Sequence, residues 1–208
     1  MSSDENYKKK IVEYQRDGRN LDKINKIREE KFDHEKLSKS EIFNVGPIKL
    51  GVIGLTTKET WISTTYPPYG YEITDYVDAI KEQVAVLKGK NADSIVVISH
   101  VGIKCSQDND ELLKYRNYTS HNAQKHTDCE MKELGELFKS GGGGGDKLLE
   151  NGKPIIDAWI AGHKHEPAHL FYNGIPVVQN PIGGLYFNAL HLSFKKTGNK
   201  YEILRDQT

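Results

Sequence analysis

The fold of this chain is decided by the stretch Ile155-Ile156-Asp157-Ala158-Trp159-Ile160-Ala161-Gly162-His163-Lys164-His165. Residues 155–161 are mostly apolar and of strand length, which predicts a buried β-strand. This run passes directly into Gly-His-Lys-His at 162–165, so residues able to bind a metal follow the end of the strand. We therefore expect the chemistry of the protein at this junction.

Two further strands are expected upstream, at 48–55 and at 94–100, and the second of them ends in His100. Between them, residues 72–89 carry apolar side chains at three- and four-residue steps behind the pair Thr74-Asp75, a pattern typical of a capped amphipathic helix. Strand, helix and strand in this order predict a βαβ-type unit and an α/β fold.

The remaining segments are predicted from shorter signals. Asn173-Gly174 between two apolar runs favours a β-hairpin with a two-residue turn, and a last strand is expected at 189–194. Residues 104–127 are polar and predict a loop, and a capped helix carrying Met131, Leu134, Leu137 and Phe138 on one side should follow it. The glycine-rich stretch 140–146 reads as a flexible loop.

Length and charge composition limit how many domains the chain can form and which partners it can attract. The chain has 208 residues, and its 29 Lys and Arg balance its 29 Asp and Glu, so no net charge attracts nucleic acid or anionic lipid. We expect no nucleic-acid or membrane partner, and the sequence contains neither a secretion signal nor a run long enough for a transmembrane helix. Residues 1–45 are predicted to be a charged, weakly ordered or helical segment, and residues 46–208 the folded domain.

Histidines are the candidate functional residues. Because the carboxyl ends of strands meet at one edge of an α/β sheet, His100, His163 and His165 are expected to come together as metal ligands. Imidazole suits Zn, Mn or Fe rather than Mg or Ca. In extended backbone, His163 and His165 would leave on one face and share an ion or serve two neighbouring ions. The other histidines are expected to be surface or hydrogen-bonded residues: His34, His121, His126, His169 and His191.

Three segments together resemble the calcineurin-like metallophosphoesterases, and among them the 5'-nucleotidase branch: 51–60, 97–102 and 157–165. The resemblance implies the C-terminal half of a four-layer α/β/β/α sandwich with mixed β-sheets, and hydrolysis of phosphate monoesters, above all nucleotides. It also implies that His100 and His163 bind one ion of a dimetal site and His165 its neighbour.

The motifs that complete the family's site are not found in this sequence: Asp-x-His, Gly-Asp and Gly-Asn-His-Asp/Glu. A two-metal site needs a bridging carboxylate to offset the repulsion of its cations. We therefore expect at most one weakly held ion, impaired activity, no identifiable catalytic residue and an uncovered apolar face. Four tyrosines are expected to be core or surface residues rather than a clamp for a nucleotide base: Tyr66, Tyr69, Tyr71 and Tyr186.

Two alternatives follow from the same missing carboxylates. The chain can be a non-catalytic fragment, or a degenerate paralogue that acts, if at all, as a binding module. The five consecutive glycines at 141–145 suggest a third alternative, a designed or rearranged sequence. The oligomeric state is left open by the sequence.

Overall fold

The computed structural model of the chain describes residues 38–63, 72–105, 129–130, 148–172 and 174–205. They belong to two compact units, and the smaller comprises Met1–Ser38 and Thr56–Ile73. Its described part contains the short helix α3 (Thr60–Ser63). The larger unit comprises Lys39–Leu55 and Thr74–Thr208 and holds almost all of the sheet and all three candidate ligands.

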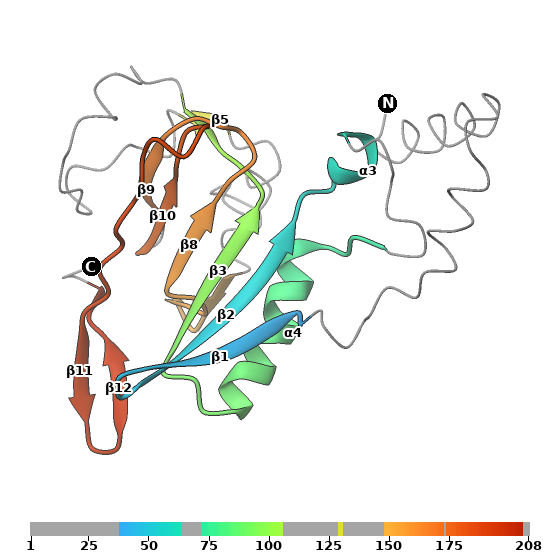
Figure 1. Ribbon diagram of the computed structural model, residues 1–208. Coiled ribbons are helices and arrows are strands. Elements are labelled where there is room, and N and C mark those ends of the chain that lie inside the picture. The colour runs from blue at the N-terminus through green and yellow to red at the C-terminus, as the bar shows by residue number, and fades with distance from the viewer. Residues whose placement is uncertain (1–37, 64–71, 106–128, 131–147, 173, 206–208) are drawn as a thin grey trace. The chain divides into compact units, whose positions relative to one another are not determined.

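A six-stranded mixed sheet forms the centre of the larger unit (Figure 1). In spatial order its strands are β1 (Ser40–Val45), β2 (Ile48–Thr56), β3 (Ser94–His100), β8 (Ala158–Ala161), β10 (Ile175–Gln179) and β9 (Ala168–Tyr172). The central strands β3, β8 and β10 are parallel to one another, whereas the pairs β1/β2 and β9/β10 are antiparallel. The predicted α/β class with a mixed sheet is confirmed, as are the strands at 48–55 and 94–100.

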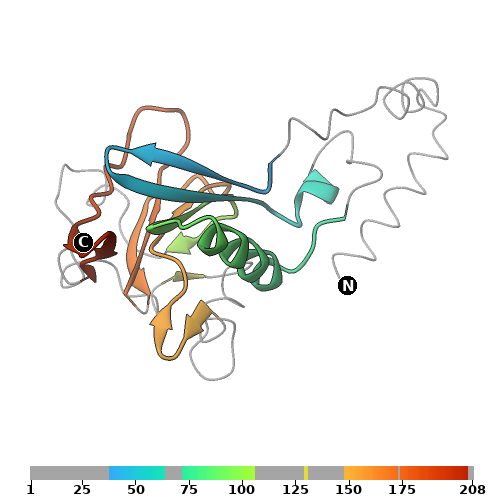
Figure 2. The same cartoon turned by 90° about the horizontal axis from the view of Figure 1, so that it is seen from below.

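Helix α4 (Tyr76–Gly89) packs on one face of this sheet (Figures 1 and 2). It buries Ile80 and Leu87 completely. A Cβ on Gly51 of β2 would lie only 2.9 Å from Leu87 Cδ1, so a glycine at this position allows close contact between helix and sheet. The predicted helix is confirmed, with its first turn beginning one residue after Asp75.

Asp75 caps α4, because its Oδ1 accepts hydrogen bonds from the backbone nitrogens of Val77 at 2.9 Å and Asp78 at 3.3 Å. We expect Asp75→Ala to lower the free energy of unfolding by about 1 kcal/mol, the usual effect of losing such a cap. Urea denaturation followed by circular dichroism measures this. Asp75→Ser keeps an acceptor oxygen and should stay close to wild type, and equal losses in the two variants would contradict the capping role.

The opposite face of the sheet is apolar and open. In the register of β3 with β8, Val97 faces Trp159 and both are completely buried, whereas the next pair, Ile98 and Ile160, is 47% and 38% exposed. Phe43 on β1 is 52% exposed. Part of the apolar face expected to be uncovered is thus exposed among the described residues, whereas Val96 and Ala158 on the same face are buried.

Two expectations near the ends of the domain are corrected. Residues 40–45, assigned by sequence to the charged segment, form β1, because the turn at Gly46 (φ 57°) folds them back along β2. The expectation of a last strand at 189–194 is wrong, because β11 begins only at Phe194. The ladder is instead a hairpin of β11 (Phe194–Thr197) and β12 (Lys200–Ile203) around Gly198 (φ 63°). Gly198-Asn199 is a hairpin signal that the sequence analysis missed.

The hairpin expected around Asn173-Gly174 is confirmed by the antiparallel pairing of β9 with β10, with φ 77° at Gly174. Two small ladders complete the described structure: β4 (Lys104–Cys105) with β5 (Cys129–Glu130), and β6 (Leu149–Glu150) with β7 (Lys153–Pro154). The helix expected over residues 131–138, the glycine-rich stretch 140–146 and residues 1–37 lie outside the described residues. No helix in the described part is long and apolar enough to cross a membrane.

Candidate metal centre

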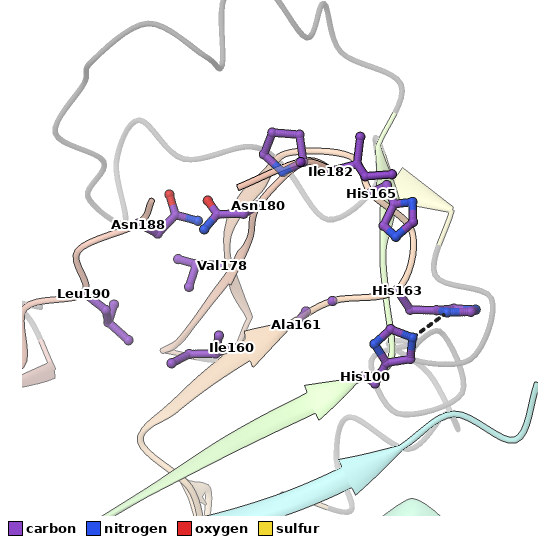
Figure 3. A pocket seen from close by; sticks show the side chains of 13 residues that line it. His100, Ile160, Ala161, His163, His165, Val178, Asn180, Ile182, Asn188 and Leu190 are labelled. Carbon is purple, nitrogen blue, oxygen red and sulfur yellow. Dashed lines mark hydrogen bonds between the residues drawn. The ribbon is translucent and has the colours of Figure 1, made fainter. Parts of the chain in front are cut away.

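A cleft of about 530 Å³ lies at the carboxyl ends of β3, β8 and β10 (Figure 3). All three predicted histidines line it, together with Asn180, Asn188 and apolar side chains from β8 and β10. This is the edge at which ligands of α/β sheets bind, because the loops that follow parallel strands gather there. The structure therefore places the three candidate residues along one cavity.

His100 and His163 are in direct contact. The Nε2 atom of His100 and the Nδ1 atom of His163 are 3.1 Å apart, and the ring centroids are separated by 4.8 Å at an interplanar angle of 66° (Figure 3). For an ion about 2.0–2.1 Å from both nitrogens, the nitrogen–metal–nitrogen angle would be about 100°, which lies between the octahedral and tetrahedral values. In the structure this separation is that of a hydrogen bond between the two rings, and it would also suit two neighbouring ligand positions on one transition-metal ion.

His165 lines the same cleft but does not complete a metal cluster. Among the described residues, no group of three or more His, Cys, Asp or Glu side chains is arranged to hold an ion. No Asp or Glu is found among the described residues that line the cleft. The side chains that the structure brings together are thus the two imidazoles of His100 and His163.

The backbone between the two loop histidines is not extended, and the expectation based on an extended His-x-His is wrong. Lys164 N donates to Gly162 O at 3.0 Å, and His163 between them has φ 78°, which makes this segment a γ-turn. His165 also has a positive φ, 57°. Such conformations are unfavourable for residues with a Cβ, and backbone strain of this kind is found more often at active sites and ligand-binding sites than elsewhere.

The loops after β3 and β8 are held together by their backbones. Gly162 N donates a 3.2 Å hydrogen bond to Val101 O. A Cβ built on Gly102 would lie 2.2 Å from Gly162 O and 2.6 Å from Lys164 N, distances that no real side chain tolerates. Gly102 therefore permits the approach that sets His100 against His163.

Gln179, at the end of β10, fixes both loops. This buried side chain accepts a 2.9 Å hydrogen bond from Ile103 N and donates from Nε2 to Ile103 O and to Glu166 O. Ile103 lies three residues after His100, and Glu166 directly follows His165. Sequence analysis missed this residue, because a glutamine at the end of an apolar strand carries no signal for its distant partners.

A buried hydrogen-bond chain lies beneath His100. Trp159 Nε1 donates to Ser99 Oγ at 2.8 Å, and Ser99 Oγ donates to Val101 O at 3.2 Å. Trp159 is completely buried. Polar groups of the strand end are thus satisfied inside the core, which restricts the backbone on either side of His100.

At the other end of β8, Asp157 joins three parts of the chain. Its Oδ2 atom accepts hydrogen bonds from Ser94 Oγ and Ile95 N, both at 2.8 Å, and its Oδ1 atom forms an ion pair with Arg205. These contacts set the register of β3 beside β8. The aspartate of the segment 157–165 is therefore structural, and it lies at the opposite end of β8 from the cleft.

The chain is distantly similar to several proteins of known structure. No family profile and no curated protein matches the chain. A calcineurin-like phosphoesterase from Bacillus subtilis, YfkN, is similar over 81% of this chain and 48% of its own, at 18% identity and a TM-score of 0.46.

Two 5'-nucleotidase structures are also similar to the chain. The similarity to a putative 5'-nucleotidase from Staphylococcus aureus covers 80% of this chain and 28% of that protein, at 19% identity and a TM-score of 0.43. For a 5'-nucleotidase precursor from Thermus thermophilus the two shares are 79% and 23%, at 19% identity and a TM-score of 0.35. The chain thus spans less than half the length of these structures.

Proposed function

We propose that this chain carries the histidine side of a metal-dependent phosphoesterase centre of the 5'-nucleotidase type, acting on phosphate monoesters and in particular on nucleotides. The observation that carries the proposal is the 3.1 Å separation of His100 Nε2 and His163 Nδ1 at the strand-end cleft. These are the two residues that the sequence resemblance assigns to one ion. Nucleotides as the substrate class rest on that resemblance.

The pair His100 and His163 would hold a divalent ion of the Zn, Mn or Fe type. A bound ion of this kind polarises a phosphoryl oxygen and lowers the pKa of bound water. The protein's own part is to fix the two imidazoles through Gly102 and Gln179 and to leave the cleft open beside them. Without a carboxylate among the described lining residues, two neutral imidazoles bind one ion weakly, and the activity of the chain alone is expected to be low.

One observation favours a second candidate, a binding module without catalysis. The described lining of the cleft contains no Asp or Glu that could act as general base or bridge two ions. In this alternative, the cleft binds a metal or a phosphorylated ligand and does not turn it over. The two candidates differ in whether phosphate is released.

Metal binding provides the first test. We expect Zn²⁺ to bind in isothermal titration calorimetry, and His100→Ala and His163→Ala each to weaken it about tenfold or more, because each removes one of two paired ligands. His191→Ala is the matched control, since His191 is exposed and does not line the cleft. Equal binding by all four proteins would refute the site.

Phosphate release from adenosine monophosphate, with Mn²⁺ or Zn²⁺ added, then separates the two candidates. Turnover that His100→Ala or His163→Ala abolishes and His191→Ala retains supports the phosphoesterase. Metal binding without release at any metal concentration supports the binding module.

A further inference from the structure

The cleft has two chemically different ends. Figure 3 shows Asn180 and Asn188 on the side away from the three imidazoles, with the apolar side chains of Ile160 and Val178 on the same side as the asparagines and Ala161 between the two groups. No Lys or Arg is found among the described lining residues. The imidazole end suits a metal and an anion, whereas the asparagine end is polar and uncharged.

Asn188 is held in one orientation by a residue behind it. Its Oδ1 atom is 2.7 Å from His169 Nε2. An amide oxygen can only accept a hydrogen bond, so the proton of His169 is on Nε2 in this pair. The NH₂ group of Asn188 is then available to donate hydrogen bonds to a ligand in the cleft. His169 is partly buried, and burial lowers its pKa, although the hydrogen bond to Asn188 opposes this shift. A neutral ring with a fixed donor is therefore the form expected at neutral pH.

We propose that Asn180 and Asn188 bind the leaving group of the substrate, and that this group is uncharged and hydroxylated, as a pentose is. The proposal rests on the proposed function. It further assigns His169, which does not line the cleft, as a positioning residue for Asn188.

The chemistry of the cleft selects this ligand class. A carboxamide offers both donors and an acceptor, which matches a hydroxyl group, whereas a phosphate would be held far better by Arg or by a metal. The apolar side chains of Ile160 and Val178, which lie beside the asparagines, provide a surface on which the carbon skeleton of such a leaving group can pack. A charged leaving group would enter the asparagine end without a counter-ion.

The test uses three probes on the whole chain with Zn²⁺: ribose 5-phosphate, phenyl phosphate and inorganic phosphate. Asn180→Leu and Asn188→Leu should each weaken ribose 5-phosphate by about three- to tenfold, as expected for one lost hydrogen bond, and change the other two by less than about twofold. His169→Phe should reproduce this selective loss, and His169→Gln, which keeps a donor, should restore part of it. Equal weakening of all three probes would mean that these residues are only structural and would overturn the inference.

Free ribose, titrated without metal, provides a reading that is independent of the proposed function. We expect it to shift the side-chain amide signals of Asn180 and Asn188 in the NMR spectrum, and absence of any shift contradicts the inference. Ribose binding without phosphate release would leave the asparagine site standing while the phosphoesterase proposal fails. Phosphate release that is unaffected by either asparagine substitution would leave the enzyme standing and overturn the inference.

Discussion

Gly102→Ala is expected to lower the free energy of unfolding by at least about 3 kcal/mol and to abolish the metal affinity of the chain. The added Cβ would lie 2.2 Å from Gly162 O and 2.6 Å from Lys164 N. Both neighbours are backbone atoms of the γ-turn around His163, so no side-chain rotation relieves the overlap. The loops must move apart, which separates His100 from His163.

Gly54→Ala is the matched control, because an added Cβ at this exposed position meets nothing within 4 Å. It should keep wild-type stability and Zn²⁺ affinity. Urea denaturation and zinc titration of the two variants measure both effects. A Gly102→Ala protein that binds zinc as tightly as wild type would show that contact between the loops does not set the site.

Gln179→Leu is expected to produce a loss of similar size, about 3–5 kcal/mol. Leucine has nearly the same volume but leaves Ile103 N, Ile103 O and Glu166 O without their hydrogen bonds to this side chain, and an unpaired buried polar group costs about 1–3 kcal/mol. The loops after His100 and His165 then lose their common anchor. Zinc affinity should fall together with stability.

The same substitution at Gln83 tests whether the effect belongs to the site. Gln83 is also buried, but its Oε1 atom accepts a 2.7 Å hydrogen bond from the side chain of Ser40, away from the cleft. Gln83→Leu should cost about 1–2 kcal/mol and leave zinc affinity unchanged. If Gln83→Leu weakens zinc binding as much as Gln179→Leu does, general destabilisation explains both results and the anchoring role of Gln179 is refuted.

In the proposed two-ended cleft, the imidazole end would bind the metal and the phosphoryl group, and the asparagine end would bind the leaving group. Three imidazoles come from the ends of two parallel strands, whereas the two asparagines follow β10 farther along the chain. Because the two groups lie on different loops, their substitutions should act on different parts of a ligand. Ribose 5-phosphate, phenyl phosphate and inorganic phosphate differ in the group attached to phosphate, so the asparagine substitutions should affect only the first of them.

The sequence by itself determined the α/β class, the strands that end at His100 and just before His163, the capped helix and the hairpin at Asn173-Gly174. Each depends on neighbouring residues, since apolar periodicity, an Asp at a helix start and an Asn-Gly turn act over a few positions. The candidate ligands could be found for the same reason: each histidine lies within four residues of the last apolar residue of a strand-length run.

Only the tertiary structure decided which histidines meet, and how. The positive φ angles of His163 and His165 and the close approach of Gly102 to Gly162 depend on contacts between separate loops. The three hydrogen bonds of Gln179 reach partners that are 13 and 76 residues away along the chain. Residues 40–45 likewise form a strand because β2 provides partners for their backbone hydrogen-bonding groups. Contacts of this kind depend on how separate elements pack in space, and the local pattern around each residue does not contain that information.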